Sequence, residues 1–439
     1  MLRALGEVAV SNGSDISDEV REWLARTWDD DLTLRDWWSR LASAGWAFPS
    51  WPAGHGGRDL PPAAARDVAQ ALGEAGAIGP PGGLGQMMGG PVVIEHGTEE
   101  QQDNWLLPLA SGRESWCQLF SEPGAGSDLA SLQTRAVRDG DVWVVNGQKV
   151  WTTGARTADR GMLVARTDPD SPKHKGITYF IIDMDQPGVD VRPLKQMDGG
   201  ATFNEVFFSD AVVPHENIVG SANNGWAVAV STLAYERQGI GGGGGGGGRR
   251  GIGAGAPGEK NGMLDRKVGE LKQAASRRQG EQAAAAAAQS FDAIVRLARS
   301  HGRTADPIVR QRLAAMRSMS EAHRMSGLRG RAAAQAGRMP GPEVSTGKLV
   351  TSSLGRQARD ISLAVEGAHG MLMGEDAPER GRFQQMALRI QSGSIAGGTD
   401  EIQRNIIGER VLGLPREPQI DRDVPFRELR VGTQREEKS

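Results

Sequence analysis

The spacing of apolar residues changes twice along this 439-residue chain, and these changes constrain the fold more than any other feature. Up to about residue 115 the spacing is helical, as in segments 15–26, 32–45 and 63–76. Between Trp116 and residue 225 it gives way to short β-branched and aromatic runs bounded by Gly, Asp or Pro. From Trp226 helical spacing returns almost to Gly413. We therefore expect a mainly α protein with a small antiparallel β domain between two helical parts.

The predicted domains are an N-terminal helical domain (1–115), a central β domain (116–225), a C-terminal helical bundle (226–418) and a tail (419–439). Asn146-Gly147 predicts a hairpin turn within the β domain. Inside the third part, residues 241–262 are so rich in glycine that ordering them costs much backbone entropy, and we predict a mobile loop there. The expected β runs are 116–120, 143–145, 149–151, 161–165, 177–183, 189–191 and 205–209, and the long bundle helices are 316–330, 348–366 and 383–391.

Composition excludes several classes of protein. The chain has 51 Lys and Arg against 54 Asp and Glu, and this balance argues against nucleic-acid binding. The single cysteine, Cys117, lies in an apolar run and is expected to be a small buried side chain, and the seven histidines show no metal-ligand spacing, so no metal is expected. No segment approaches the roughly 20 apolar residues that span a bilayer, and no apolar signal core is found. We expect a soluble cytoplasmic protein with no membrane partner.

The octet Ser121-Glu122-Pro123-Gly124-Ala125-Gly126-Ser127-Asp128 concentrates polar chemistry in one turn. It holds two carboxylates, two hydroxyls and two glycines. Glycine allows close approach of the backbone to a ligand, and such loops present N–H groups to polar ligands. By itself, the octet is equally well explained as a tight surface turn.

Four motifs in order make the chain resemble the acyl-CoA dehydrogenase family, over residues 32–418. The octet lies within LFSEPGAGSDLAS (119–131), which is similar to the family's T/S-E-P-x-x-G-S-D signature. The other three are NGQKVWTTGA (146–155), VFFSDAVVPHENIVG (206–220) and GGTDEIQRNIIGERVLGLPRE (397–417). The resemblance implies an N-terminal helical domain, a central β domain and a C-terminal four-helix bundle. It also implies flavin adenine dinucleotide (FAD) between the β domain and the bundle, with an acyl-CoA thioester against the flavin ring.

The same resemblance assigns residues to the two ligands. Ser127 matches a position that contacts the coenzyme A portion of the substrate. Trp151 and Thr153 match the aromatic ring and hydroxyl that flank the flavin ring, and Thr399 and Glu401 match positions near the adenosine half of the cofactor. The full set of expected cofactor contacts is Gln118, Phe120, Ser121, Trp151, Thr153, Thr399 and Glu401.

The catalytic base departs from the commonest family pattern. Many members carry a glutamate before the G-T of the last motif, but Gly397 stands at that position here. A second family location is a glutamate followed by arginine on the first bundle helix, and LAYERQG (233–239) supplies Glu236 and Arg237 there. We therefore expect Glu236 to be the base and Arg237 to lie at the substrate, with Gly397 offering its N–H to the thioester oxygen. Glu401 is a weaker candidate for the base.

Two further departures concern the part of the flavin site that a partner subunit usually completes. The family's R-x-x-F-G motif is missing after the base helix, and Ala364 replaces an expected glutamine. The resemblance implies a tetramer, and these losses leave open whether it is a homo-tetramer with a weakened cofactor site or a hetero-tetramer with a related subunit.

The expected activity is FAD-dependent oxidation of an acyl-CoA to a trans-2-enoyl-CoA, with electrons passed to an electron-transfer flavoprotein. A base on the bundle helix leaves room for branched or bulky acyl groups. Two alternatives stay open: a non-catalytic partner subunit of a hetero-oligomeric dehydrogenase, and an oxygen-using flavoenzyme on the same fold.

Overall fold

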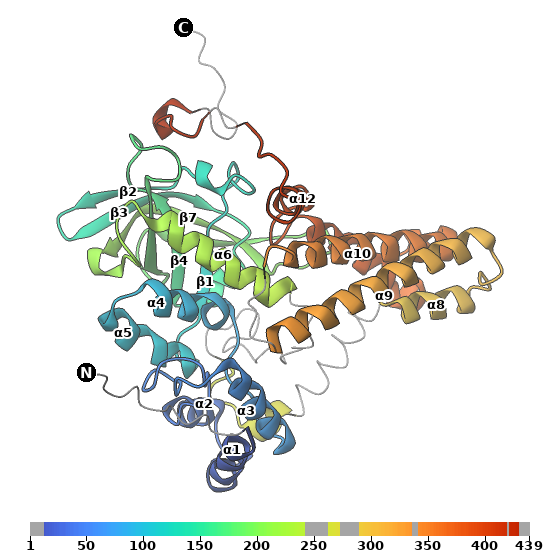
Figure 1. Ribbon diagram of the computed structural model, residues 1–439, viewed down its shortest axis with the longest axis horizontal. Helices are drawn as coiled ribbons and strands as arrows, with labels where there is room; N and C mark the ends of the chain where they lie inside the picture. Colours follow the sequence, from blue (N-terminus) through green and yellow to red (C-terminus); the bar gives the residue numbers. More distant parts are fainter. Residues whose placement is uncertain (1–12, 242–261, 273–288, 336–340, 419–420, 430–439) are drawn as a thin grey trace, which may run out of the picture.

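A computed structural model describes residues 13–241, 262–272, 289–335, 341–418 and 421–429. Helices at the N-terminal end pack beneath a curled sheet, and a long helical bundle extends to one side of both (Figure 1). The predicted Gly-rich loop at 241–262 lies almost entirely outside the described residues. Helices thus precede and follow a central sheet, as the changes in apolar spacing predict.

The N-terminal helices bury an aromatic core. Trp37 and Trp38 of α2 are fully buried, and their indole N–H groups donate to the carbonyls of Ile78 and Gly79 at 2.7 and 2.9 Å. Thr98 begins α5 with a capping box that involves Gln101. The helices are α1 (Gly13–Thr27), α2 (Leu34–Ser43), α3 (Pro62–Glu74), α4 (Gly90–His96) and α5 (Glu99–Ala110), with a π-helical turn, η1 (Gly85–Gly89), before α4.

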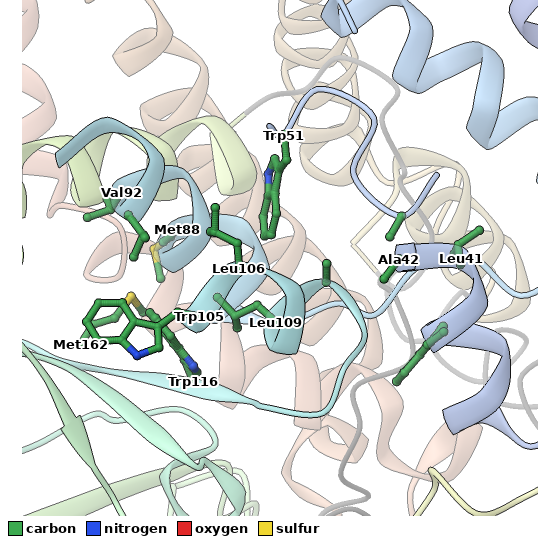
Figure 2. Close-up of a cluster of buried hydrophobic side chains, with 14 of the residues drawn as sticks. Leu41, Ala42, Trp51, Met88, Val92, Trp105, Leu106, Leu109, Trp116 and Met162 are labelled. Carbon is green, nitrogen blue, oxygen red and sulfur yellow. The ribbon is translucent and has the colours of Figure 1, made fainter. Parts of the chain in front are cut away.

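Glycines in η1 and α4 let the N-terminal helices approach the sheet closely. A Cβ atom on Gly89 would lie 2.7 Å from the ring of Trp116, and one on Gly90 would lie 2.3 Å from the ring of Trp51. Figure 2 shows Trp105, Trp116 and Met162 together in this core, below η1 and α4. A single buried cluster therefore joins the N-terminal helices to the first strand of the sheet.

The seven-stranded sheet has the order β1-β4-β2-β3-β7-β6, with β5 paired to β4. Most pairs are antiparallel, but β1 and β2 each run parallel to β4. The expectation of a purely antiparallel sheet was wrong here, because alternation of apolar residues does not encode strand direction. The strands are β1 (Trp116–Leu119), β2 (Arg135–Asp139), β3 (Val142–Lys149), β4 (Arg160–Arg166), β5 (Ile177–Asp183), β6 (Val189–Leu194) and β7 (Phe203–Pro214).

The predicted hairpin turn at Asn146-Gly147 was wrong. Both residues lie inside β3, where the pairing with β7 shifts by a bulge between Val145 and Gly147. Gly147 has a φ of +154°, and a Cβ there would lie 2.4 Å from the hydroxyl of Thr134. A glycine in a strand marks a bulge or a close approach as readily as a turn, and here it marks both a bulge and a close approach. Strand β2 was missed because Ala136 is its only buried residue.

The bundle is built around α10, which packs on α8, α9 and α11. Its buried residues form a core of their own that includes Ile361 and Phe383. The three predicted bundle segments fall in α9, α10 and α11. The elements are α6 (Gly225–Gly241), α8 (Phe291–Ser300), α9 (Pro307–Gln335), α10 (Val344–Glu366), α11 (Arg382–Arg389) and α12 (Asp400–Ile406).

Two segments of the C-terminal half pack outside the bundle. Residues 262–272, which the predicted boundary assigned to the bundle, bind α2 instead: the N–H of Leu34 donates to Arg266 and that of Arg35 to Leu264. Their apolar side chains, such as Val268, enter the N-terminal core. Residues 421–429 return to the sheet, beside the loop between β4 and β5.

Candidate functional site

A buried ion pair fixes the octet to the sheet. The ammonium of Lys149, at the end of β3, lies 2.8 Å from a carboxylate oxygen of Glu122 and donates to the carbonyl of Phe120 at 3.0 Å. Glu122 also accepts from the backbone N–H groups of Gln133 and Thr134, at 2.7 and 2.9 Å. Glu122 is thereby a structural residue, and it holds the backbone of the octet's first turn in place.

The surroundings of Glu122 favour its charged form. Burial opposes ionisation, but the charge and hydrogen bond of Lys149, together with the backbone donors, hold the pKa of this carboxyl below its usual value. Lys149 is fully buried, so its charge depends on this partner. The octet drew attention by its carboxylates, yet sequence reasoning gave Glu122 no role, since the partner lies 27 residues away in the chain.

The expected flavin contacts of the second motif follow directly on this pair. The N–H of Val150 donates to the carbonyl of Ser121 at 2.9 Å, so the octet and the 150–153 turn are joined. Trp151 has a φ of +62° and its side chain is 58% exposed, with only an edge contact to Phe203. Thr153 is exposed, and the hydroxyl of the buried Thr152 has no hydrogen-bond partner among the described residues.

This turn fits a flat aromatic ligand. A left-handed backbone is unfavourable for tryptophan, and a large exposed indole loses hydrophobic stabilisation unless something covers it. Such outliers cluster at ligand sites. The exposed indole of Trp151, with the Thr153 hydroxyl two residues on, offers what an isoalloxazine ring uses: an apolar face and a hydrogen-bonding group. The residues present therefore fit a flavin.

The expected base lies at the other side of this region. Gln118 of β1 donates its side-chain amide N–H to a carboxylate oxygen of Glu236 of α6, at 3.4 Å. Both side chains are half-buried. The structure thus brings together an expected flavin contact and the expected base, which lie 118 residues apart in sequence. The side chain of Arg237, the expected substrate contact, lies outside the described residues.

Polar contacts on two sides orient the part of α6 that precedes Glu236. The hydroxyl of Tyr235 donates to Glu95 of α4 at 2.9 Å, and Thr232 donates to the hydroxyl of Tyr179 in β5 at 3.3 Å. Burial, reinforced by Glu95, raises the pKa of Tyr235 to about 12, so this hydroxyl stays a donor at neutral pH. The position of Glu236 is therefore set by a helix tied to both α4 and the sheet.

The last motif forms a glycine turn before α12. Gly397 and Gly398 have φ values of +66° and +88°, and the side chain of Gln403 donates to both carbonyls. Thr399 caps α12 by accepting from the N–H of Ile402. Glu401 is exposed and pairs with Arg404 at 3.2 Å. These residues make local contacts on the bundle, apart from the group that joins Gln118 to Glu236.

The end of the octet faces solvent. Gly126, Ser127 and Asp128 are exposed, whereas Leu129 and Ala130 that follow are buried. Ser127 is therefore accessible to a ligand, as the expected contact with coenzyme A requires. Cys117 is fully buried, and burial raises the pKa of its thiol to about 12, which rules it out as a nucleophile.

Sequence profiles of all three acyl-CoA dehydrogenase domains match the chain. The N-terminal domain matches residues 14–113, the middle domain 117–211 and the C-terminal domain 276–412. The fold and the matches define an FAD-dependent oxidoreductase, with helical outer parts around a curled sheet. The chain belongs to the acyl-CoA dehydrogenase family.

Curated relatives and solved structures agree with this assignment. The chain is 36% identical to acyl-CoA dehydrogenase IpdE1 of Mycobacterium tuberculosis, over 87% of this chain and 88% of that protein. It is 34% identical to IpdE1 of Mycolicibacterium smegmatis, over 91% and 97%. Among structures, the Tcur3481-Tcur3483 steroid ACAD aligns with a TM-score of 0.63 at 26% identity, over 94% of this chain and all of that one. The ChsE4-ChsE5 complex from Mycobacterium tuberculosis aligns at 0.61 and 27%, over 95% and 100%.

Two searches of the described residues gave negative results. None of the helices there combines the length and apolar character needed to cross a bilayer. The same residues contain no group of three or more His, Cys, Asp and Glu side chains arranged to hold a metal ion.

Proposed function

We propose that this protein oxidises an acyl-CoA at its α and β carbons, with Glu236 as the base. The contact between Gln118 and Glu236 carries the proposal, because it puts a carboxylate of α6 beside β1, the strand that leads into the octet. Gly397 has no side chain to take a proton. Glu236 is then the family-type base that this chain retains.

The step removes one proton and one hydride. Glu236, ionised, takes the proton from the α carbon, and the electron pair of that C–H bond becomes part of the new double bond. The flavin, when bound, supplies the acceptor for the hydride that leaves the β carbon. The N–H of Gly397 polarises the thioester carbonyl and so acidifies the α C–H. Trp151 and Thr153 position the ring, and Ser127 contacts coenzyme A.

The proposed substrate is an acyl-CoA with a bulky, branched or ring-containing acyl group. A base on the bundle helix supports this class, and a structural relative is titled a steroid ACAD. The proposed electron acceptor is an electron-transfer flavoprotein.

Anaerobic titration with a panel of acyl-CoAs tests this function. The flavin absorbance of the purified protein should bleach with a branched or polycyclic acyl-CoA and respond less to a short straight-chain one. Reoxidation should be fast with an electron-transfer flavoprotein and slow with oxygen. Rapid turnover with oxygen alone would favour the oxygen-using alternative, and a flavin-bearing protein that no acyl-CoA bleaches would contradict the proposal.

A second candidate role is that of a subunit in a hetero-tetramer. The ChsE4-ChsE5 and Tcur3481-Tcur3483 structures are complexes of two named chains, and Ala364 replaces a glutamine on the partner-facing half of the expected flavin site. Colour separates the roles. A chain that purifies colourless, and becomes yellow and active only with a related subunit, would support the partner role over an independent enzyme.

A further inference from the structure

The described C-terminal segment 421–429, here called the C-terminal clasp, binds the loop between β4 and β5. The N–H of Phe426 donates to the carbonyl of Ser171 and that of Arg427 to Pro169, both at 3.0 Å. Pro425 forms an isolated bridge with Pro172. In Figure 1 this dark red segment lies above the sheet, after the chain has left α12. The chain thus returns from the bundle to the sheet at a specific place.

Arg166, the last residue of β4, links the clasp to the end of the octet. Its guanidinium donates to the carbonyl of Ala130 at 2.6 Å and to that of Lys173 at 2.7 Å, and it lies 3.7 Å from the ring centre of Phe426. Arg166 is only 4% exposed, and Phe426 covers it. A buried guanidinium needs its hydrogen bonds and its cover, so these three segments hold one another.

Lys173 makes a second link between the same segments. Its ammonium lies 2.7 Å from Asp421 of the clasp and 3.2 Å from Asp128 of the octet. The side chain is 12% exposed. Burial opposes its charge, but the two carboxylates outweigh that effect and raise the pKa of Lys173, while its hydrogen bond lowers the pKa of Asp421. The lysine therefore stays charged between the octet and the clasp.

These links end beside the proposed coenzyme A contact. Asp128 adjoins Ser127, and both are exposed. Exposed cations flank them on both sides of the junction: Lys175 on the β4–β5 loop and Arg422 on the clasp. Coenzyme A carries its phosphates on the nucleotide half, and phosphates are bound by such cations.

We propose that the C-terminal clasp is a positioning element of the coenzyme A subsite. Asp421 and Phe426 hold Lys173 and Arg166, which fix the octet where Ser127 meets the substrate. The clasp therefore sets affinity for the nucleotide half of acyl-CoA and leaves the flavin chemistry unchanged. This inference rests on the proposed function, since it takes an acyl-CoA as the ligand.

A competing role would act through the base helix. The β4–β5 loop also reaches the segment around the start of α6, where Thr167 donates to Asn223 and the ring of His174 lies 4.9 Å from that of Trp226. If the clasp acted by this route, its loss would move Glu236 and change the rate of flavin reduction for every thioester.

The experiment compares Asp421→Asn and Phe426→Ala with Asp423→Asn, a change of an exposed carboxylate on the same clasp. Binding of free coenzyme A to the flavin-bearing protein is measured by calorimetry. KM and kcat are measured with an acyl-CoA that bleaches the wild type and with the matching acyl-pantetheine, which lacks the nucleotide. We expect Asp421→Asn to raise the Kd for coenzyme A and the KM for acyl-CoA by about five- to tenfold, the loss of one charge-assisted hydrogen bond. KM for acyl-pantetheine, kcat and flavin content should stay as in wild type.

Three outcomes would overturn the clasp proposal: an unchanged Kd for coenzyme A in both variants, an equal rise in KM for both thioesters, or a changed kcat for both. Should Phe426→Ala fail to fold, Asp421→Asn decides alone. Failure of the proposed function looks different, because no acyl-CoA or acyl-pantetheine would then bleach the wild-type flavin.

Discussion

At the scale of single residues, the account depends on how Gln118 holds Glu236. An amide N–H donated to a carboxylate is a charge-assisted hydrogen bond, and at 3.4 Å this one is at the long end of the range. Gln118 is therefore a positioning residue, which acts through the base. Its backbone neighbours Phe120 and Ser121 are fixed separately, through Lys149 and Val150.

Gln118→Leu should slow flavin bleaching by acyl-CoA by about tenfold, because losing a weak charge-assisted contact costs about 1.4 kcal/mol of positioning. Substrate KM and flavin content should not change, a split that a merely structural role would not produce. The measurement is stopped-flow reduction under anaerobic conditions. Gln148→Leu is the matched control, since Gln148 donates to Glu205 at 3.3 Å away from the base. Equal rates in the Gln118 and control variants would remove the positioning role.

At the scale of elements, the octet depends on β3 through the pair between Glu122 and Lys149. Breaking a buried pair leaves an uncompensated charge, which costs about 3–5 kcal/mol. Surface pairs contribute little by comparison, about 0–1 kcal/mol. The octet and strand should therefore lose order together when either partner is removed.

Glu122→Gln should lower the free energy of unfolding by about 3 kcal/mol at pH 7, measured by urea denaturation, whereas Glu401→Gln in an exposed pair should change it little. The folded-state pKa of Glu122 is depressed, so the wild type has this stability above the unfolded carboxyl value of 4.5 and loses it as pH falls through the folded value. The gap between wild type and variant should therefore narrow in acid. A gap that is constant down to pH 3 would contradict this role for the pair.

At the scale of the whole molecule, the end of α10 exposes an apolar segment. Met371, Leu372 and Met373 are 82, 38 and 47% exposed, directly after the 364–370 stretch that departs from the family pattern. Adjacent exposed apolar side chains of this kind mark subunit contacts. Oligomer assembly, which the resemblance predicts, therefore has a specific surface on this chain.

Met371→Lys together with Met373→Lys should shift the mass measured by light scattering from a tetramer towards smaller species, because charges are not tolerated in an apolar contact. Met197→Lys, on a 67% exposed methionine of the β6–β7 connection, is the control and should leave the mass unchanged. A tetramer that survives the double change would exclude this surface.

Much of this organisation could be predicted from the sequence, because helical and strand periodicities change where the architecture changes. Resemblance added Glu236 and Trp151. Other features depended on contacts between distant segments: the partner of Glu122, the parallel pairing of β1, and the return of residues 421–429 to the sheet. The clasp buries only one large side chain, Phe426, so its nine residues carry no periodic signal.

The central claim, that Glu236 is the base, is tested most directly by Glu236→Gln. Loss of a general base should cut the rate of flavin bleaching by about 10²–10⁴-fold, while the amide leaves shape and flavin content intact. Glu401→Gln, which alters the weaker candidate, should bleach like the wild type. Flavin reduction at the wild-type rate in Glu236→Gln, under the same acyl-CoA concentration, would contradict the account.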